Sequence, residues 1–307
     1  MRTTTSAALT LVLAASLAPA QQPPRFASEV RAVELDVAVT RDGRPVRGLT
    51  AADFQVRDAG VAQTIELVER SRSRVQAILL LDTSGSVAGE KLGQLKHAAR
   101  SFVEGLSAED SVTLLSFSYR VRQLTAPGAT KGAAVAAIER LAAGGTTAIF
   151  DAVAAATALS DPRRGRPLLL VFSDGDDRVS WLTERHVIDA ARGADLVVPA
   201  IGFAPTRRAP RDPLRRLPNE KPQLAGSPRF LERVTEATGG RPWSADAPAD
   251  LVPAFLSVLE DVRERYLLRY EPAGVPSEGW HPLEVRVRDK GLSVRCRPGY
   301  QVIAASP

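Results

Sequence analysis

The feature that most constrains the fold is the apolar run at residues 75–82, which reads Val-Gln-Ala-Ile-Leu-Leu-Leu-Asp. Six of the seven residues before Asp82 are apolar, and no polar alternation follows Gln76. A strand that is covered on both faces has this continuous pattern, whereas a half-exposed strand alternates. The run is also too short to cross a membrane. It therefore predicts a buried strand of a parallel sheet that ends on an acidic residue.

Around this run, residues 74–265 alternate between strand and helix patterns. Further strands are expected at 111–117, 167–172 and 195–203, with a short edge strand at 120–124. Helices are expected at 90–106, 133–141, 149–159, 183–192, 230–237 and 251–265. Such alternation predicts an α/β domain with a doubly wound, mostly parallel, Rossmann-like sheet.

Both flanks of this domain have β patterns, over residues 29–70 and 266–303. Residues 30–40 and 283–287 alternate between apolar and polar side chains, as half-buried strands do. Each block is too small to bury much surface alone. We therefore expect the two blocks to pair into a small β-sandwich, with the α/β domain inserted between them.

The first 20 residues have the pattern of a secretory signal peptide. Arg2 precedes an apolar segment at 7–17, and Ala18-Pro19-Ala20 is a small-residue cleavage site, so cleavage is predicted after Ala20. No later apolar run approaches 18 residues, so we expect a secreted or periplasmic protein with no integral membrane segment after cleavage. Cys296 is the only cysteine, which excludes an internal disulfide.

The net charge of +5 raises the question of nucleic-acid binding. The arginines are scattered, without aromatic interleaving or a basic helix, and this pattern argues against a nucleic-acid partner. They are most concentrated at 204–229, a segment that also carries six prolines. We interpret this segment as a loop within the α/β domain. It is either an electropositive gate for acidic partners or a solvated insertion.

Oxygen donors follow the predicted strand ends in three loops. Asp82, Ser84 and Ser86 come directly after the first strand, and Asp174 follows the strand at 167–172. Thr146 and Thr147 open a helix on the same rim. Ligands of open α/β sheets lie outside the carboxyl ends of the strands, and Mg2+ prefers oxygen donors. An ion held by few carboxylates keeps positive charge and would recruit an anionic ligand, such as a carboxylate of a partner protein.

Three motifs make residues 75–265 resemble a von Willebrand factor type A domain. They are Asp82-Thr-Ser84-Gly-Ser86, Gly-Gly-Thr-Thr-Ala-Ile-Phe-Asp-Ala at 144–152, and Phe-Ser-Asp-Gly at 172–175. The resemblance implies a metal-ion-dependent adhesion site for Mg2+ or Mn2+. Its ligands, direct or through water, would be Asp82, Ser84, Ser86, a loop threonine and Asp174. Counting back from Ala152 favours Thr147, which we predict, whereas counting forward from Gly144 favours Thr146.

The flanking segments 39–54, 238–240 and 297–300 also resemble a bacterial group of such proteins, the VWFA-related proteins. This resemblance implies a non-enzymatic interaction or adhesion protein, with a partner that presents a carboxylate at the metal.

Two alternatives stay open. One is a metal-free structural module, in which the same residues only cap turns. The other is a metal-dependent hydrolase. Ser84 stands where phosphatases of the haloacid-dehalogenase type need a second acid, and His97, His186 and His281 lie on separate elements, so we predict no enzyme. Trp181 is either an exposed ligand contact or a partly buried residue.

Overall fold

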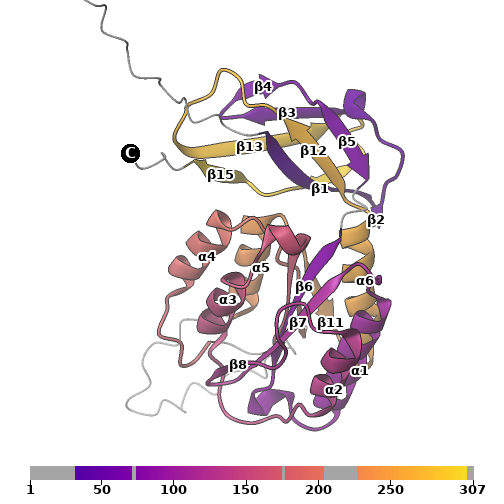
Figure 1. Cartoon of the computed structure of the whole chain (residues 1–307), viewed down its shortest axis with the longest axis vertical. Helices are drawn as coiled ribbons and strands as arrows, with labels where there is room; N and C mark the ends of the chain where they lie inside the picture. The colour runs from indigo at the N-terminus through magenta and orange to yellow at the C-terminus, as the bar shows by residue number, and fades with distance from the viewer. Residues whose placement is uncertain (1–31, 71–73, 175–176, 204–226, 303–307) are drawn as a thin grey trace, which may run out of the picture.

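The computed structural model describes residues 32–70, 74–174, 177–203 and 227–302. It has a β unit, formed from both ends of the described chain, and an α/β unit formed from the middle (Figure 1). The predicted signal peptide at 1–20 and most of the Arg/Pro-rich segment at 204–229 lie outside the described residues. None of the described helices is long and apolar enough to cross a membrane.

One six-stranded sheet forms the centre of the α/β unit. Its order is β11 (Pro242–Ala245), β10 (Ala200–Phe203), β9 (Arg166–Phe172), β6 (Val75–Asp82), β7 (Ser111–Phe117) and β8 (Val121–Gln123). The first five strands are parallel, and β8 pairs antiparallel at the edge. All eight residues of β6 are buried, which confirms the strand predicted from its continuous apolar run.

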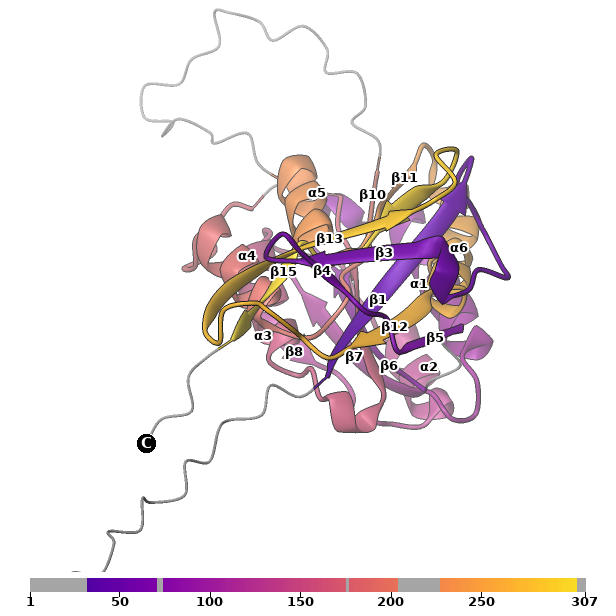
Figure 2. The same ribbon diagram turned by 90° about the horizontal axis from the view of Figure 1, so that it is seen from above.

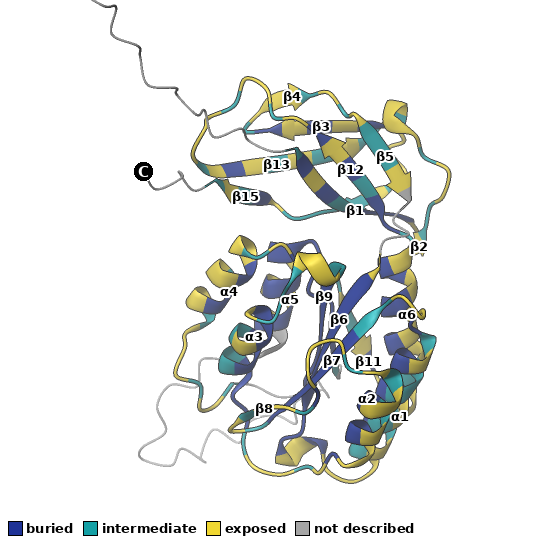
Figure 3. Ribbon diagram, in the orientation of Figure 1, coloured by how far each residue is buried: buried dark blue, intermediate teal, exposed yellow. Residues whose placement is uncertain are grey.

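Helices cover both faces of this sheet (Figure 3). One face carries α1 (Glu90–Gly105), α2 (Lys131–Glu139) and α6 (Leu251–Arg263). The other carries α3 (Ile149–Thr157), α4 (Glu184–Gly193) and α5 (Ser227–Thr238). Alternate residues of β6 point to opposite sides, so Leu79 and Leu81 enter the first core while Ile78 and Leu80 enter the second. The sheet is thus doubly wound, as the sequence predicts.

Two details of the sheet differ from the sequence prediction. The strand expected at 195–203 pairs continuously only from Ala200, with an isolated bridge at Val197. Pro199 explains the break because proline has no N–H to donate to the ladder. In addition, β11 was not predicted, because it is only four residues long and only Ala245 of it is buried.

Two antiparallel sheets form the β unit and share one apolar core (Figure 2). One contains β14 (Ser293–Arg295), β1 (Val33–Arg41), β12 (Tyr266–Tyr270) and β5 (Leu67–Arg70), with β2 (Arg44–Pro45) beside β1. The other contains β15 (Gly299–Val302), β13 (Gly279–Val287), β3 (Phe54–Asp58) and β4 (Val61–Gln63). Leu35 and Leu268 of the first sheet pack in one cluster with Phe54 and Val56 of the second.

A polar group is buried within this apolar β unit. The Asp58 carboxylate is fully buried and accepts hydrogen bonds from the hydroxyls of Tyr270 at 2.8 Å and Tyr300 at 2.6 Å. His281 Nδ1 lies 2.9 Å from the same carboxylate. Burial and the Asp58 carboxylate raise the pKa of both tyrosines. Two tyrosines and a histidine thus satisfy the buried Asp58 carboxylate, while His281 Nε2 has no hydrogen-bond partner among the described residues.

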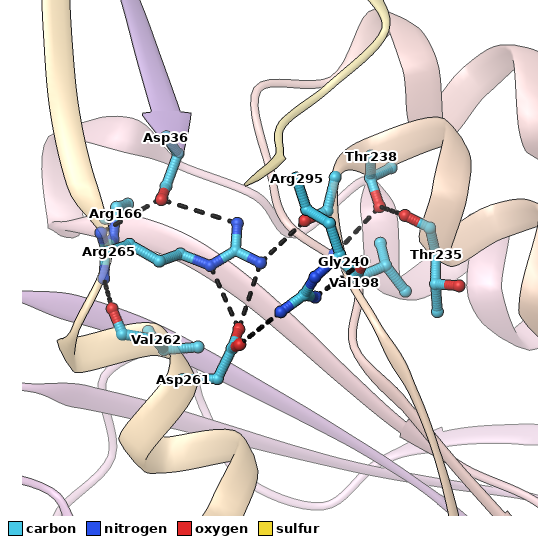
Figure 4. A network of polar contacts seen from close by, with 11 residues as sticks. Asp36, Arg166, Val198, Thr235, Thr238, Gly240, Asp261, Val262, Arg265 and Arg295 are labelled. Atoms are coloured by element: carbon cyan, nitrogen blue, oxygen red, sulfur yellow. Dashed lines mark hydrogen bonds and ion pairs between the residues drawn. The ribbon is translucent and has the colours of Figure 1, made fainter. Parts of the chain in front are cut away.

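A buried cluster of charges joins the two units (Figure 4). Arg265, only 1% exposed, lies 3.6 Å from Asp36 on β1 and 3.2 Å from Asp261 on α6. Arg166, the first residue of β9, lies 3.2 Å from Asp36, and Arg295 on β14 lies 2.7 Å from Asp261. The β unit is therefore attached at the end of the sheet where the parallel strands begin.

Candidate metal centre

The predicted donors lie at the opposite end of the sheet from the β unit. Asp82 is the last residue of β6, and Asp174 follows β9 by two residues. Strands β6 and β9 are parallel neighbours, with Leu81 opposite Phe172. Their carboxyl ends meet at one rim, so both acids are brought to the same place, as the strand order requires.

The first loop folds back on its own acid. Asp82 is fully buried, and its carboxylate accepts hydrogen bonds from the Ser84 backbone N–H at 2.8 Å and the Ser173 hydroxyl at 2.6 Å. A short 3₁₀ turn at Gly85–Val87 then brings the Ser86 hydroxyl within 3.0 Å of the Ser84 hydroxyl. The alternation of donor and spacer residues therefore places both serine oxygens on the same side of the loop.

Asp174 contacts a serine hydroxyl of the first loop from a second loop. Its Oδ1 accepts a hydrogen bond from the Ser86 hydroxyl at 2.7 Å. Its Oδ2 forms an ion pair with Lys91 Nζ at 2.6 Å, and Lys91 also donates to the Ser86 carbonyl at 3.2 Å. The side chain of Asp174 is 2% exposed and that of Lys91 36%. Lys91, in the first turn of α1, was not singled out from the sequence because 83 residues separate it from Asp174.

The threonine loop packs directly against this site. Gly144 N–H donates to the Thr83 carbonyl at 2.8 Å, and Gly85 N–H donates to the Gly145 carbonyl at 2.9 Å. Gly145 has a φ of 83° and the Tyr119 ring lies against it, so a side chain there would be strained and would clash. Thr147 is buried at 4% exposure, whereas Thr146 is half-buried. The choice of Thr147 over Thr146 stays a prediction.

The electrostatics of the site favour a cation. Burial raises the pKa of the Asp82 carboxyl above its ordinary value; hydrogen bonds from Ser173 and Ser84 oppose the rise, and the charge of Asp174 adds to it. Lys91 offsets one negative charge through Asp174, and its ammonium shows that a cation is accommodated beside these oxygens. Two nearby carboxylates in a buried setting are stabilised by further positive charge.

The donor set also fits a hard divalent ion. Mg2+ and similar ions take oxygen ligands, and this rim offers the Asp82 and Asp174 carboxylates together with the Ser84 and Ser86 hydroxyls. In the part of the chain that the structure describes, no group of three His, Cys, Asp or Glu side chains could hold a metal. A centre here would therefore depend on hydroxyl as well as carboxylate oxygens.

A hydrogen-bonded loop beside the site presents an exposed tryptophan. Trp181 is 95% exposed, so the alternative of partial burial is wrong. Its backbone N–H and that of Leu182 both donate to the Asp151 carboxylate, while Arg178 N–H donates to the Thr147 carbonyl at 2.9 Å. Trp181 is therefore held close to the threonine loop without being buried.

The three histidines do not take part in this site. His97 and His186 are exposed on α1 and α4, and His186 sits beside the capping residue Thr183. His281 is buried in the β unit with Asp58, an arrangement that sequence inspection missed because the two residues are 223 positions apart.

Residues 77–176 match the family model for the von Willebrand factor type A domain. No curated protein sequence matches the chain significantly. Solved structures do, at low identity. A von Willebrand factor type A protein from Catenulispora acidiphila is 13% identical with a TM-score of 0.50, over 89% of this chain and 75% of that one.

Proximal thread matrix protein 1 from the mussel byssus is 15% identical with a TM-score of 0.50, over 67% of this chain and 50% of its own. A further structure of that byssus protein has a zinc-occupied MIDAS motif; it is 14% identical with a TM-score of 0.48, over 67% of this chain and 49% of that one. At these identities, the likeness concerns the fold alone.

Proposed function

We propose that this chain, which carries a von Willebrand factor type A domain, binds one divalent cation, Mg2+ or Mn2+, at the rim of that domain and captures a partner protein there. Asp82, Ser84, Ser86, Thr147 and Asp174 would hold the ion, directly or through water. The bound ion would supply positive charge for a carboxylate of the partner. This role is that of an interaction or adhesion module and not of an enzyme.

The observation that supports this proposal most is the hydrogen-bonded series from Asp82 through Ser84 and Ser86 to Asp174. It joins residues from two separate loops: the backbone N–H of Ser84 meets the fully buried Asp82, and the two serine hydroxyls lead on to Asp174. A turn-capping role would account for the contact between Asp82 and Ser84, but not for the contact of Ser86 with an acid 88 residues away.

Two other functions remain as rivals with distinct expectations. A metal-free structural module would use the Lys91–Asp174 pair as its permanent contact. A metal-dependent hydrolase would need a proton-transfer group beside the ion, and Ser84, which is hydrogen-bonded within the series, is a poor candidate for that role.

We further infer that the protein acts outside the cytoplasm, in the periplasm or secreted. The apolar segment at 7–17 and the Ala18-Pro19-Ala20 site support this inference. We also infer that the two sheets of the β unit are one β-sandwich into which the type A domain is inserted. Their shared core and the pairing of β1 with β12 support it, because those strands come from opposite ends of the described chain.

Thermal unfolding in Mg2+ and in chelator tests the proposal. A ligand that binds only the native state adds about 2.7 kcal/mol of stability at one hundred times its Kd. We expect such a stabilisation in the wild-type protein and none in Asp82→Ala. Equal unfolding of wild type in Mg2+ and chelator would favour the structural module. Turnover of generic phosphate esters that is lost in Asp82→Ala would favour the hydrolase.

A further inference from the structure

A pocket of about 300 Å3 opens beside the candidate metal centre. Thr83 and Gly144 line it, and these are the residues whose backbones join the first loop to the threonine loop. The far wall comes from the end of β7, the turn into β8 and the last turn of α2. The pocket thus shares its edge with the site at which a partner is proposed to dock.

Three arginines line this pocket, and no acidic residue does: Arg120, Arg122 and Arg140. All three are exposed, and in the described part of the chain none of them pairs with an acid. Glu139, which directly precedes Arg140 in the sequence, pairs with Arg100 instead. Three unpaired guanidinium groups around one hollow create a local positive potential.

The arginines lie on or directly beside regular elements. Arg122 lies opposite Ser116 in the β7–β8 ladder, so the two share one face. Arg120 stacks on Tyr119, with its guanidinium carbon 5.1 Å from the ring centre, and Tyr119 in turn packs on Gly145. Arg140 ends α2. A guanidinium group can bind a carboxylate through two parallel hydrogen bonds.

We propose that this arginine pocket is a second binding site for the same partner and takes an acidic peptide segment next to the carboxylate that reaches the metal. This inference rests on the proposed metal function. The two sites are contiguous through the Thr83–Gly144 contact, so one extended acidic segment could occupy both. The pocket would then select segments with several acidic residues over those with one.

The test uses the full chain and a fluorescein-labelled deca-aspartate peptide, with anisotropy read in Mg2+ at about 0.15 M salt, where surface charges are partly screened. Replacing Arg122 and Arg140 by Gln should weaken binding about 2- to 30-fold, as expected for the loss of two exposed charge contacts. The matched control replaces Arg44 and Arg288, exposed arginines of the β unit, and removes the same charge. It should change the affinity by less than about twofold.

The outcomes separate the two proposals. A loss confined to Arg122→Gln/Arg140→Gln, with the Mg2+-dependent thermal stabilisation intact, supports the pocket. The pocket proposal is overturned if, with that stabilisation intact, the variant binds the peptide as tightly as wild type. It is also overturned if the Arg44/Arg288 control loses as much affinity. Inorganic phosphate and free aspartate are also compared as competitors of the labelled peptide. If phosphate competes more tightly than aspartate, and this competition is lost in Arg122→Gln/Arg140→Gln, the choice of a carboxylate partner is overturned. If Mg2+ does not stabilise the wild-type protein, the metal function fails and docking at two sites fails with it.

Discussion

Lys91→Met should strengthen Mg2+ binding while weakening the metal-free fold. Lys91 Nζ lies 2.6 Å from Asp174 Oδ2, so an ion that uses Asp174 would compete with this ammonium. The lysine side chain is 36% exposed, which screens the pair, and such pairs contribute about 0.5–1.4 kcal/mol. The Mg2+ affinity should therefore rise about 2- to 10-fold. In chelator, the free energy of unfolding should fall by about the energy of the ion pair, because Asp174 is left buried without this partner.

Titration calorimetry at physiological ionic strength measures the affinity, and urea unfolding in chelator measures the metal-free stability. Lys96→Met is the matched control, because Lys96 is on the same helix but donates to the Glu139 carbonyl at 2.8 Å. Its Mg2+ affinity should stay within about twofold of wild type. The reasoning is refuted if Lys91→Met binds Mg2+ no more tightly than wild type, since the ammonium would then not compete with the ion.

Three further predictions concern the rest of the fold. Arg265→Met should cost about 3–5 kcal/mol in urea unfolding, because it removes a buried charge from Asp261, whereas Arg163→Met, at an exposed position, should leave the urea midpoint nearly unchanged. Burial raises the pKa of the Asp261 carboxyl, but Arg265 and Arg295 outweigh this and hold it below its ordinary value. The stability that the Asp261 ion pairs contribute is therefore present above about pH 4 and is lost as the pH falls further. A stability loss in Arg265→Met that stays constant down to pH 2 would contradict this. Burial raises the pKa of the Cys296 thiol to about 11, so a thiol reagent at pH 8 should modify the native protein at least about 100-fold more slowly than the urea-unfolded chain, and equal rates would show an accessible thiolate. Trp181→Ala should change the free energy of unfolding by less than about 0.5 kcal/mol while reducing the fraction of fluorescence that iodide quenches; a large loss of stability would mean that the ring is packed.

The strongly patterned parts of the fold could be predicted from sequence. The strand ending at Asp82 followed from an uninterrupted apolar run, and the helices around it from periodic apolar faces. The short strands could not be predicted as reliably. β15 has four residues and β4 three, so neither carries a period long enough to recognise. Their strand conformation depends on pairing with distant partners, which local propensity does not encode.

The candidate site was predictable only where the chain order itself brings residues together. Asp82 and Asp174 both follow buried parallel strands, so the topology alone places them at one rim. Lys91 could not be found in this way, because a lysine in the first turn of a helix gives no signal of a long-range ion pair. The role of the buried Asp58 could not be predicted either, because its partners Tyr270 and His281 lie more than 200 residues later.

Direct measurement of ion binding tests the central claim. Mn2+ titrated into the metal-free protein and followed by electron paramagnetic resonance counts free and bound ion separately. We predict one bound Mn2+ per chain that Mg2+ displaces, and no bound Mn2+ at the same concentrations in Asp82→Ala. Unfolding of that variant in chelator, compared with wild type, checks that it is folded. A folded wild-type chain that binds no Mn2+, or an Asp82→Ala variant that binds it as well as wild type, would contradict the account.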